Sequence, residues 1–205
     1  MGNKGEITRE LLITEAAKLF HKKGFRGTSI SDLTAATGVK KGSLYFHFLS
    51  KDDLGLAVLE WSREKWLEFS KIALSGITPG DCLLNFFNTV VSYHRDLGFI
   101  GGCIFGNTAL EMSDSDQRYV KFIDQFFSDM ADMLEDFIVA AQEAGQIRVD
   151  IPANILAEHI VLTMEGGMMF ARLRKDERTL RQCYDTLLIF LQLSTMSPNL
   201  MRICR

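Results

Sequence analysis

Cysteine and proline are scarce in this chain of 205 residues, and long apolar runs are missing. The four cysteines, Cys82, Cys103, Cys183 and Cys204, are far apart and form no C-x-x-C pair, so we expect neither a zinc site nor a disulfide framework. No stretch approaches the ~18 consecutive apolar residues of a membrane span, and the polar start lacks the apolar segment of a secretory signal. These absences favour a protein of the reducing cytoplasm that holds no metal or cofactor and enters no membrane.

The patterns of common enzyme classes are missing as well. The sequence contains no nucleophile elbow, no metal-ligand cluster and no phosphate-binding loop. The obvious acid–base candidates are Glu111, Glu165, His94 and His159, and no spacing groups them. Glu158 directly precedes His159, and adjacent residues point to different sides of a helix. The sequence therefore argues against an enzyme.

Charge is distributed unevenly along the chain. The formal net charge is −3, which is unusual for a protein that binds nucleic acid. Residues 1–51, however, contain nine Lys or Arg and four Asp or Glu, whereas residues 52–205 contain 14 and 22. A basic N-terminal segment on an acidic remainder is expected when only this segment contacts phosphate. The alternative is a chance fluctuation of surface charge.

Apolar residues recur at spacings near 3.6 through most of the chain, which predicts an ordered, all-α protein. Gly24, Gly38, Gly145 and Pro152 mark breaks between helices. The short alternating run at 146–151 is interpreted as a connector. Helices are expected at 8–21, from 28 or 29 to 37, 40–46, from 51 to the mid-70s, 81–97, 104–112, 115–144, 153–173 and 176–194.

Residues 28–48 contain the most informative motif, two short helices joined by a tight turn at Gly38. One side of this unit is apolar and is expected to pack on the preceding helix: Ile30, Leu33, Val39, Leu44 and Phe48. The second helix would expose polar, basic and small residues: Lys40, Lys41, Gly42, Ser43, Tyr45 and His47. Hydrogen-bond donors on so slim a helix suit the major groove of DNA.

These residues resemble the DNA-binding domain of the TetR family of bacterial repressors. The resemblance covers roughly residues 8–55 without a gap. It rests on Gly24-Phe25-Arg26-Gly27-Thr28-Ser29-Ile30, on Ala36-Thr37-Gly38-Val39-Lys40-Lys41-Gly42-Ser43-Leu44-Tyr45-Phe46-His47-Phe48, and on Lys51-Asp52-Asp53-Leu54. It implies a three-helix helix-turn-helix domain at 1–52, joined by a long helix to a larger helical effector-binding and dimerisation domain at 53–205.

The resemblance also implies roles for individual residues. The residues expected to hold phosphates are Thr28, Tyr45, His47 and Lys51, and those expected nearest the bases are Lys40, Lys41, Gly42 and Ser43. Glycine at position 42 permits a close approach of the backbone to DNA. Lys51 facing solvent and His47 packing in a partly buried position are the competing interpretations.

The C-terminal part is rich in phenylalanine and methionine, most of which are expected to form core. A helical body of this composition can also enclose an apolar cavity, because methionine repacks around varied shapes. TetR-like proteins usually hold their inducer in this domain. The candidate effector-binding residues are Trp61, Trp66, Phe87, His94, Cys103, Phe105, Asn107, Phe126, Glu165 and Met169.

Residues 101–111, Gly-Gly-Cys-Ile-Phe-Gly-Asn-Thr-Ala-Leu-Glu, resemble a Gly-Cys-x-x-Gly-Asn-x-x-x-Glu signature of one branch of TetR-like regulators. Some members of that branch sense electrophiles or oxidants through cysteine. A helix N-terminus would favour the thiolate of Cys103. In the competing interpretation Cys103 is a small buried apolar residue and Asn107 a structural cap.

The last two expected helices carry apolar stripes: Ile155, Leu156, Ile160 and Val161, and Leu180, Tyr184, Leu187, Leu188 and Leu191. Gly166 and Gly167 cost their helix roughly 1–2 kcal/mol. Either close contact at a dimer interface or space for a ligand beside Glu165 would compensate this cost in helix stability. The resemblance implies a homodimer whose last two helices form a four-helix bundle.

The predicted function is a repressor that binds a palindromic double-stranded operator as a homodimer, with two recognition helices one turn apart. A small-molecule effector in the C-terminal domain is expected to release it from DNA. Two alternatives remain open at this point. One is a redox- or electrophile-responsive regulator that senses through Cys103, and the other is a DNA-binding protein without an effector.

Overall fold

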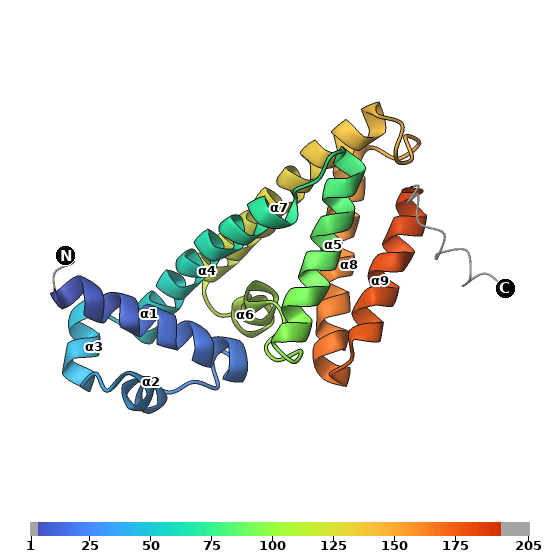
Figure 1. Ribbon diagram of the computed structural model, residues 1–205. Coiled ribbons are helices and arrows are strands. Elements are labelled where there is room, and N and C mark those ends of the chain that lie inside the picture. Colours follow the sequence, from blue (N-terminus) through green and yellow to red (C-terminus); the bar gives the residue numbers. More distant parts are fainter. Residues whose placement is uncertain (1–3, 194–205) are drawn as a thin grey trace.

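The computed structural model describes residues 4–193, and within them it contains helices and no strand (Figure 1). The all-α prediction is therefore confirmed. The helices are α1 (Lys4–Lys23), α2 (Ile30–Thr37), α3 (Lys41–His47), α4 (Lys51–Ala73), α5 (Pro79–Asp96), α6 (Ile104–Met112), α7 (Gln117–Glu143), α8 (Ala153–Arg174) and α9 (Glu177–Leu191). Cys204 and the expected end of the last helix at residue 194 lie outside the described residues.

Helix starts are defined by side-chain caps. Ser29 is the N-cap of α2: its hydroxyl accepts the Asp32 amide at 3.1 Å, and the Asp32 carboxylate accepts the Ser29 amide at 2.8 Å. Thr78 and Asp81 form the same reciprocal box at the start of α5, which therefore begins at Pro79, two residues earlier than expected. Local sequence thus determines where these helices begin.

Two apolar clusters form the interior. The first packs α1, α2 and α3 (the head) against α4, and it also contains Phe105 from α6 and Tyr119 and Phe126 from α7. The second lies among α5, α7, α8 and α9 (the body, together with α6). Trp66 and Cys103 pack against both clusters. The long helices α4 and α7 run from one end of the molecule towards the other, and α6 lies between them and α5 (Figure 1).

The head and the body are joined by more than α4. The Tyr119 hydroxyl in α7 donates to the Asp52 carbonyl at 3.0 Å. A Cβ at Gly55 would collide with the Tyr119 hydroxyl and the Phe25 ring, so glycine lets the head pack directly on α7. Across residues 4–193, no helix has the length and apolar character needed to span a membrane.

Candidate DNA interface and effector site

The α2–turn–α3 unit is held on α1 by its apolar side. Leu33 and Leu44 are fully buried, and Gly38 turns the chain with φ +68° while its amide donates to the Thr34 carbonyl at 3.0 Å. A left-handed turn of this kind favours glycine. With Leu44 directed inward, the opposite side of α3 is left at the surface.

Most of the predicted DNA-binding residues share that surface. The exposed ones are Lys40, Lys41, Gly42, Ser43 and Tyr45. His47 is half-buried, and the Lys41 ammonium lies 5.9 Å from the centre of the Tyr45 ring. Neither Lys40 nor Lys41 forms an ion pair with any described residue, so both charges are free for an anionic partner.

Sequence reasoning missed Phe46. Its side chain is 84% exposed, which is unusual for phenylalanine in a seven-residue helix. Phe46 lies one turn after Gly42 and about 200° around the helix from buried Leu44, so it points straight outward. This placement follows from helical spacing alone and could have been predicted.

Thr28 and Lys51 are engaged within the protein, which corrects their predicted placement on an open surface. The Thr28 side chain is fully buried, and its hydroxyl donates to the Gly24 carbonyl at 2.8 Å. The Lys51 ammonium donates to the Phe25 carbonyl at 2.6 Å and lies 4.3 Å from the centre of the Phe25 ring. Burial lowers the pKa of Lys51. Both side chains stabilise the α1–α2 turn, because that turn needs partners for its carbonyls.

Glu111, at the end of the Gly-Cys-x-x-Gly-Asn-x-x-x-Glu signature, completes the same turn from the body. Its carboxylate accepts the Phe25 amide at 3.2 Å and the Arg26 amide at 2.6 Å. A Cβ at Gly24, where φ is +82°, would collide with this carboxylate. The α1–α2 turn is therefore held by one carboxylate of α6.

The start of α6 is tied to both α1 and α8. The His21 ring nitrogen Nε2 hydrogen-bonds to the Gly102 carbonyl at 2.7 Å. The Asn107 amide donates to the Gly101 carbonyl at 2.6 Å, and its oxygen accepts the Arg172 guanidinium at 2.8 Å. Asn107 thus has the structural role that the competing interpretation gave it.

Cys103 is the N-cap of α6, and its sulfur accepts the Gly106 amide at 3.4 Å. Burial, followed by the nearby Glu165 carboxylate, raises the pKa of the Cys103 thiol well above its usual value. The expected thiolate is wrong, because desolvation outweighs the helix N-terminus. Sensing through an ionised Cys103 is therefore not favoured.

Several predicted effector residues pack against other aromatic rings. The Phe105 and Phe126 rings are stacked with centres 3.6 Å apart, and the Trp66 ring lies edge-on to Phe126 at 5.2 Å. Phe87 stacks on Tyr184 at 5.1 Å. Phe105, Phe126 and Trp66 come from α6, α7 and α4 and pack at the apolar cluster of the head, whereas Phe87 and Tyr184 come from α5 and α9 and belong to the cluster of the body.

The remaining predicted effector residues lie elsewhere. His94 is buried in α5, and burial lowers its pKa to about 4. Trp61 is half-buried beside the core of the head. Met169 is 52% exposed on the outer side of α8, so its predicted place in an interior site is wrong.

The outer side of α8 and α9 carries an apolar face. Its exposed or half-exposed members are Ile155, Leu162, Met169, Phe170, Leu173 and Ile189. A hollow of about 400 Å³ adjoins them, lined by residues that include His159, Cys183 and Phe190. Of the stripes that the sequence suggested for dimerisation, only Ile155 belongs to this face. The others are buried within the protomer: Leu156, Ile160, Val161, Leu180, Tyr184, Leu187, Leu188 and Leu191.

The paired glycines of α8 serve two different purposes. A Cβ at Gly167 would lie 2.9 Å from the Cys183 sulfur, so this glycine allows α8 and α9 to pack closely within one protomer. Gly166 faces open space in the middle of the outer apolar face. Only Gly166 is therefore available for close contact with another molecule.

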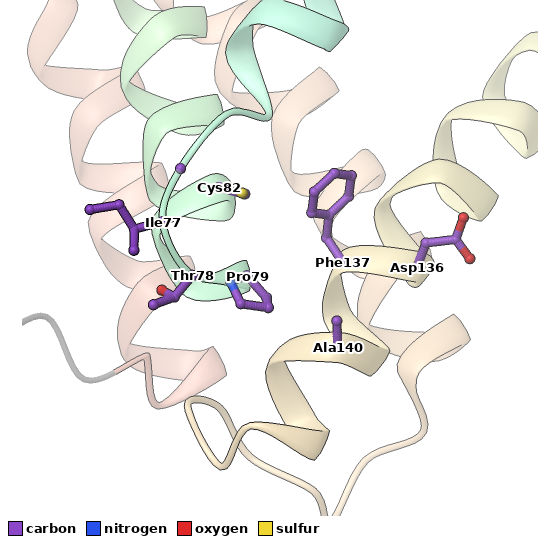
Figure 2. Close-up of a pocket in the computed structure, with 8 residues that line it drawn as sticks. Ile77, Thr78, Pro79, Cys82, Asp136, Phe137 and Ala140 are labelled. Atoms are coloured by element: carbon purple, nitrogen blue, oxygen red, sulfur yellow. The ribbon is translucent and has the colours of Figure 1, made fainter.

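A further hollow of about 320 Å³ lies between the α4–α5 loop and α7, at the end of the molecule away from the head (Figures 1 and 2). The side chains of Ile77, Pro79 and Phe137 surround it in Figure 2, with Asp136 at its side. None of the predicted site residues lines this hollow.

Comparison with known proteins gives consistent matches over both parts of the chain. Residues 12–58 match the family model described as bacterial regulatory proteins, tetR family, and residues 79–187 match the one described as tetracyclin repressor-like, C-terminal domain. An HTH-type transcriptional regulator in the lacX 3′ region of Lactococcus lactis subsp. lactis is 29% identical, over 88% of this chain and 91% of that protein. The HTH-type transcriptional repressor DhaR of Mycobacterium sp. (strain GP1) is 26% identical, over 85% and 87% respectively.

The fold matches solved structures as well. A TetR transcriptional regulator from Chloroflexus aurantiacus J-10-FL is 33% identical and superposes with a TM-score of 0.84, over 92% of this chain and 96% of that one. The relatives are transcriptional regulators, and the head carries the exposed α3 surface that such proteins need. Helix-turn-helix, body and whole-chain similarity agree, and the chain belongs to the TetR family of helix-turn-helix transcriptional regulators.

Proposed function

We propose that this protein is a homodimeric repressor that inserts α3 into the major groove of a palindromic double-stranded operator and is released by a small-molecule effector. The exposed face of α3 carries this proposal: two free lysines, a glycine and a serine precede an aromatic pair on a helix anchored by Leu44. The operator lies in the bacterial cytoplasm, which is where we place its action.

The face of α3 suggests a division of contacts. Lys40, Lys41, Gly42 and Ser43 lie at its start and are assigned to base edges, with Phe46 added as an apolar contact for a thymine methyl group. Tyr45, His47 and Lys51 are assigned to phosphates. Because Lys51 already donates to the Phe25 carbonyl, its phosphate contact would use the remaining N–H groups. Thr28 acts indirectly, by fixing the turn before α2.

The outer apolar face of α8 and α9 supports dimerisation. Leu162, Leu173 and Phe170 are each at least 42% exposed, and contiguous apolar surface of this kind marks interaction sites. Gly166 lies among them and lets a second α8 approach closely. Two copies of α8 and α9 would form a four-helix bundle and set the spacing of the two heads.

The hydrogen bonds of α6 support coupling between effector and DNA. Its start contacts the interior aromatic rings, and its end holds the α1–α2 turn through Glu111. A ligand that displaces α6 would move that turn, and with it the head. Effector binding and operator binding would then favour different positions of α6.

The experiment is selection of the bound sequence from random duplex DNA, followed by gel-shift measurement with the selected operator. Lys41→Ala and Tyr45→Ala are expected to weaken binding about tenfold or more, while their helical circular dichroism is unchanged. Lys71→Ala, on exposed α4 surface far from α3, is the matched control and should bind normally. Selection of no preferred sequence, or full affinity in both head variants, would refute the assignment.

A further inference from the structure

Glu165 is a partly buried carboxylate that has no cationic partner among residues 4–193. It lies in α8 against the start of α6, so close that a Cβ at Gly106 would collide with its Oε2 atom. Its one side-chain hydrogen bond is with the Cys103 thiol, and among residues 4–193 it forms no ion pair. Burial raises the pKa of Glu165 to about 7. A buried carboxylate is costly unless a positive charge or several donors compensate it.

The Tyr184 hydroxyl is the second unsatisfied group in this region. Tyr184 is 3% exposed, and its hydroxyl has no hydrogen-bond partner among residues 4–193. The Glu165 carboxylate is near enough to raise the pKa of the Tyr184 phenol further, after the larger effect of burial. Buried hydroxyl groups are normally hydrogen-bonded, so this one indicates a missing partner.

An aromatic ring contacts Tyr184, and another belongs to α6, the helix against which Glu165 lies. Phe87 stacks on Tyr184, and Phe105 follows Cys103 by two residues and stacks on Phe126. Tyr93 in α5 is electrostatically coupled to Cys103. Ring faces attract cations and repel anions, so aromatic walls and a carboxylate select for the same ligand charge.

We propose that Glu165 and Tyr184 belong to the effector site and that this site takes a monovalent organic cation, a protonated or quaternary amine with an apolar body. The ammonium group pairs with the Glu165 carboxylate, the Tyr184 hydroxyl contacts its polar end, and the apolar body takes the place of the Phe105 ring against Phe126. An anionic ligand would face the carboxylate directly. A metal ion is not favoured, because the described residues contain no cluster of three metal-ligating side chains.

The position of this site connects it to the head. Cys103, Gly106 and Phe105 all belong to α6 or its N-cap, and Trp66 and Cys103 lie where the two apolar clusters meet. A ligand that parts Phe105 from Phe126 must shift α6, whose other end holds Phe25 and Arg26. The proposal rests on the proposed function only in naming this ligand as the effector.

Three probes with the same phenylbutyl body and different charge test the site: 4-phenylbutylammonium, 4-phenylbutanol and 4-phenylbutyrate. Calorimetry at pH 8 with the full chain should give a dissociation constant for the ammonium probe about tenfold or more below those of the other two. Glu165→Gln should weaken the ammonium probe about tenfold and leave the alcohol nearly unchanged. Glu158→Gln, an exposed substitution on the same helix, is the control and should match the wild type.

Proton release gives a second, independent reading. At pH 6.5 Glu165 is largely protonated and must lose its proton to pair with a cation, so more than about half a proton should leave per ammonium bound. Cys103, Tyr184 and the half-exposed Tyr93 stay protonated at this pH, because loss of hydration raises the pKa of each. The Glu165→Gln variant should release no proton when the ammonium probe binds, and the Tyr184→Phe variant should still release one.

Two kinds of result would overturn the proposal. One is equal binding of all three probes, or no binding of the ammonium at millimolar concentration. The other is wild-type affinity in Glu165→Gln. Operator binding measured on the same preparation separates the two claims. If the operator is bound and the ammonium is not, the effector site is wrong and the DNA-binding function stands. If the ammonium is bound and no operator is, the DNA-binding function is wrong and the cation site stands.

Discussion

Glu111 in α6 accepts the backbone amide of Arg26 at 2.6 Å, although 85 residues separate the two in sequence. This hydrogen bond, with the one from Phe25, fixes the turn from which α2 starts. The same turn receives the Lys51 ammonium and the Thr28 hydroxyl at its carbonyls. The orientation of the DNA-binding unit is therefore determined where α1, α4 and α6 meet.

Glu111→Ala should destabilise the protein by roughly 1–3 kcal/mol, because the partly buried Phe25 amide and the exposed Arg26 amide lose a charged acceptor. Denaturant unfolding measures this loss. Operator affinity should fall as well, since the α1–α2 turn loses its support. Glu143→Ala, at the exposed end of α7, is the matched control and should change neither quantity. Unchanged stability in Glu111→Ala would show that water replaces the carboxylate without cost.

Lys41→Ala and Lys51→Ala should differ in stability although both remove a lysine from the head. Lys41 is exposed and unpaired, so its loss should weaken DNA binding alone. Lys51 holds the Phe25 carbonyl and ring, so its loss should also cost roughly 1–2 kcal/mol of unfolding free energy. Thermal or urea unfolding of the two variants decides the matter, and equal stabilities would contradict the structural role of Lys51.

Phe46→Ala should lower operator affinity roughly tenfold without lowering stability, because its ring is 84% exposed and packs on little of the protein. Discrimination against uracil in place of thymine in the operator, which removes the methyl group, should decrease in the variant. Ile77→Ala removes an even more exposed apolar side chain far from α3 and serves as the control. A variant that keeps both affinity and thymine preference would place Phe46 outside the DNA contact.

Glu165→Gln should stabilise the protein in a pH-dependent way. The pKa of Glu165 is raised from its ordinary value of 4.5 to about 7 in the folded protein, so the folded state binds the proton more tightly. Its contribution to stability is present below pH 4.5 and is lost as pH rises through 7, by roughly 2–3 kcal/mol. The difference between variant and wild type should therefore grow over this interval and level off above it. His94, with its lowered pKa, gives an opposite slope between about pH 4 and 6.5 in both proteins and cancels in the comparison.

Leu162→Glu should convert the proposed homodimer to a monomer, because it places a charge in the centre of the outer apolar face of α8. Sedimentation at micromolar concentration reads the mass, and circular dichroism checks that the protomer stays helical. Leu110→Glu is a similar change at an 85% exposed leucine of α6 and should leave the mass unchanged. If the Leu162→Glu protein is still a dimer, the interface lies elsewhere on the molecule.

The helices could be predicted from the sequence because their causes are local. The caps at Ser29 and Thr78 and the turn at Gly38 each depend on residues within four positions. The start of the first helix at Lys4, four residues earlier than expected, is the largest deviation among the helix starts. The exposure of Phe46 also follows from local helical spacing, and sequence reasoning missed it.

Features that depend on distant residues could not be predicted. Leu156 and Leu162 are alike in sequence, and because α8 is apolar on several sides, only the packing of α7 and α9 shows which one is inside. The pKa of the Cys103 thiol is raised mainly by burial and next by Glu165, 62 positions later, and both outweigh the effect of its own helix. The resemblance implied a phosphate contact for Lys51, whose carbonyl partner Phe25 lies 26 positions earlier in the sequence.

The apolar cluster of the head draws Phe105, Tyr119 and Phe126 from outside residues 1–52. A graft that moves only those residues onto another regulator would carry the recognition helix but leave part of its supporting interior behind. The graft would also lack Glu111, which holds the α1–α2 turn. In this protein, the head and the body are therefore not interchangeable modules. A new operator specificity is more readily obtained by substitutions on the open face of α3 than by recombination at the start of α4.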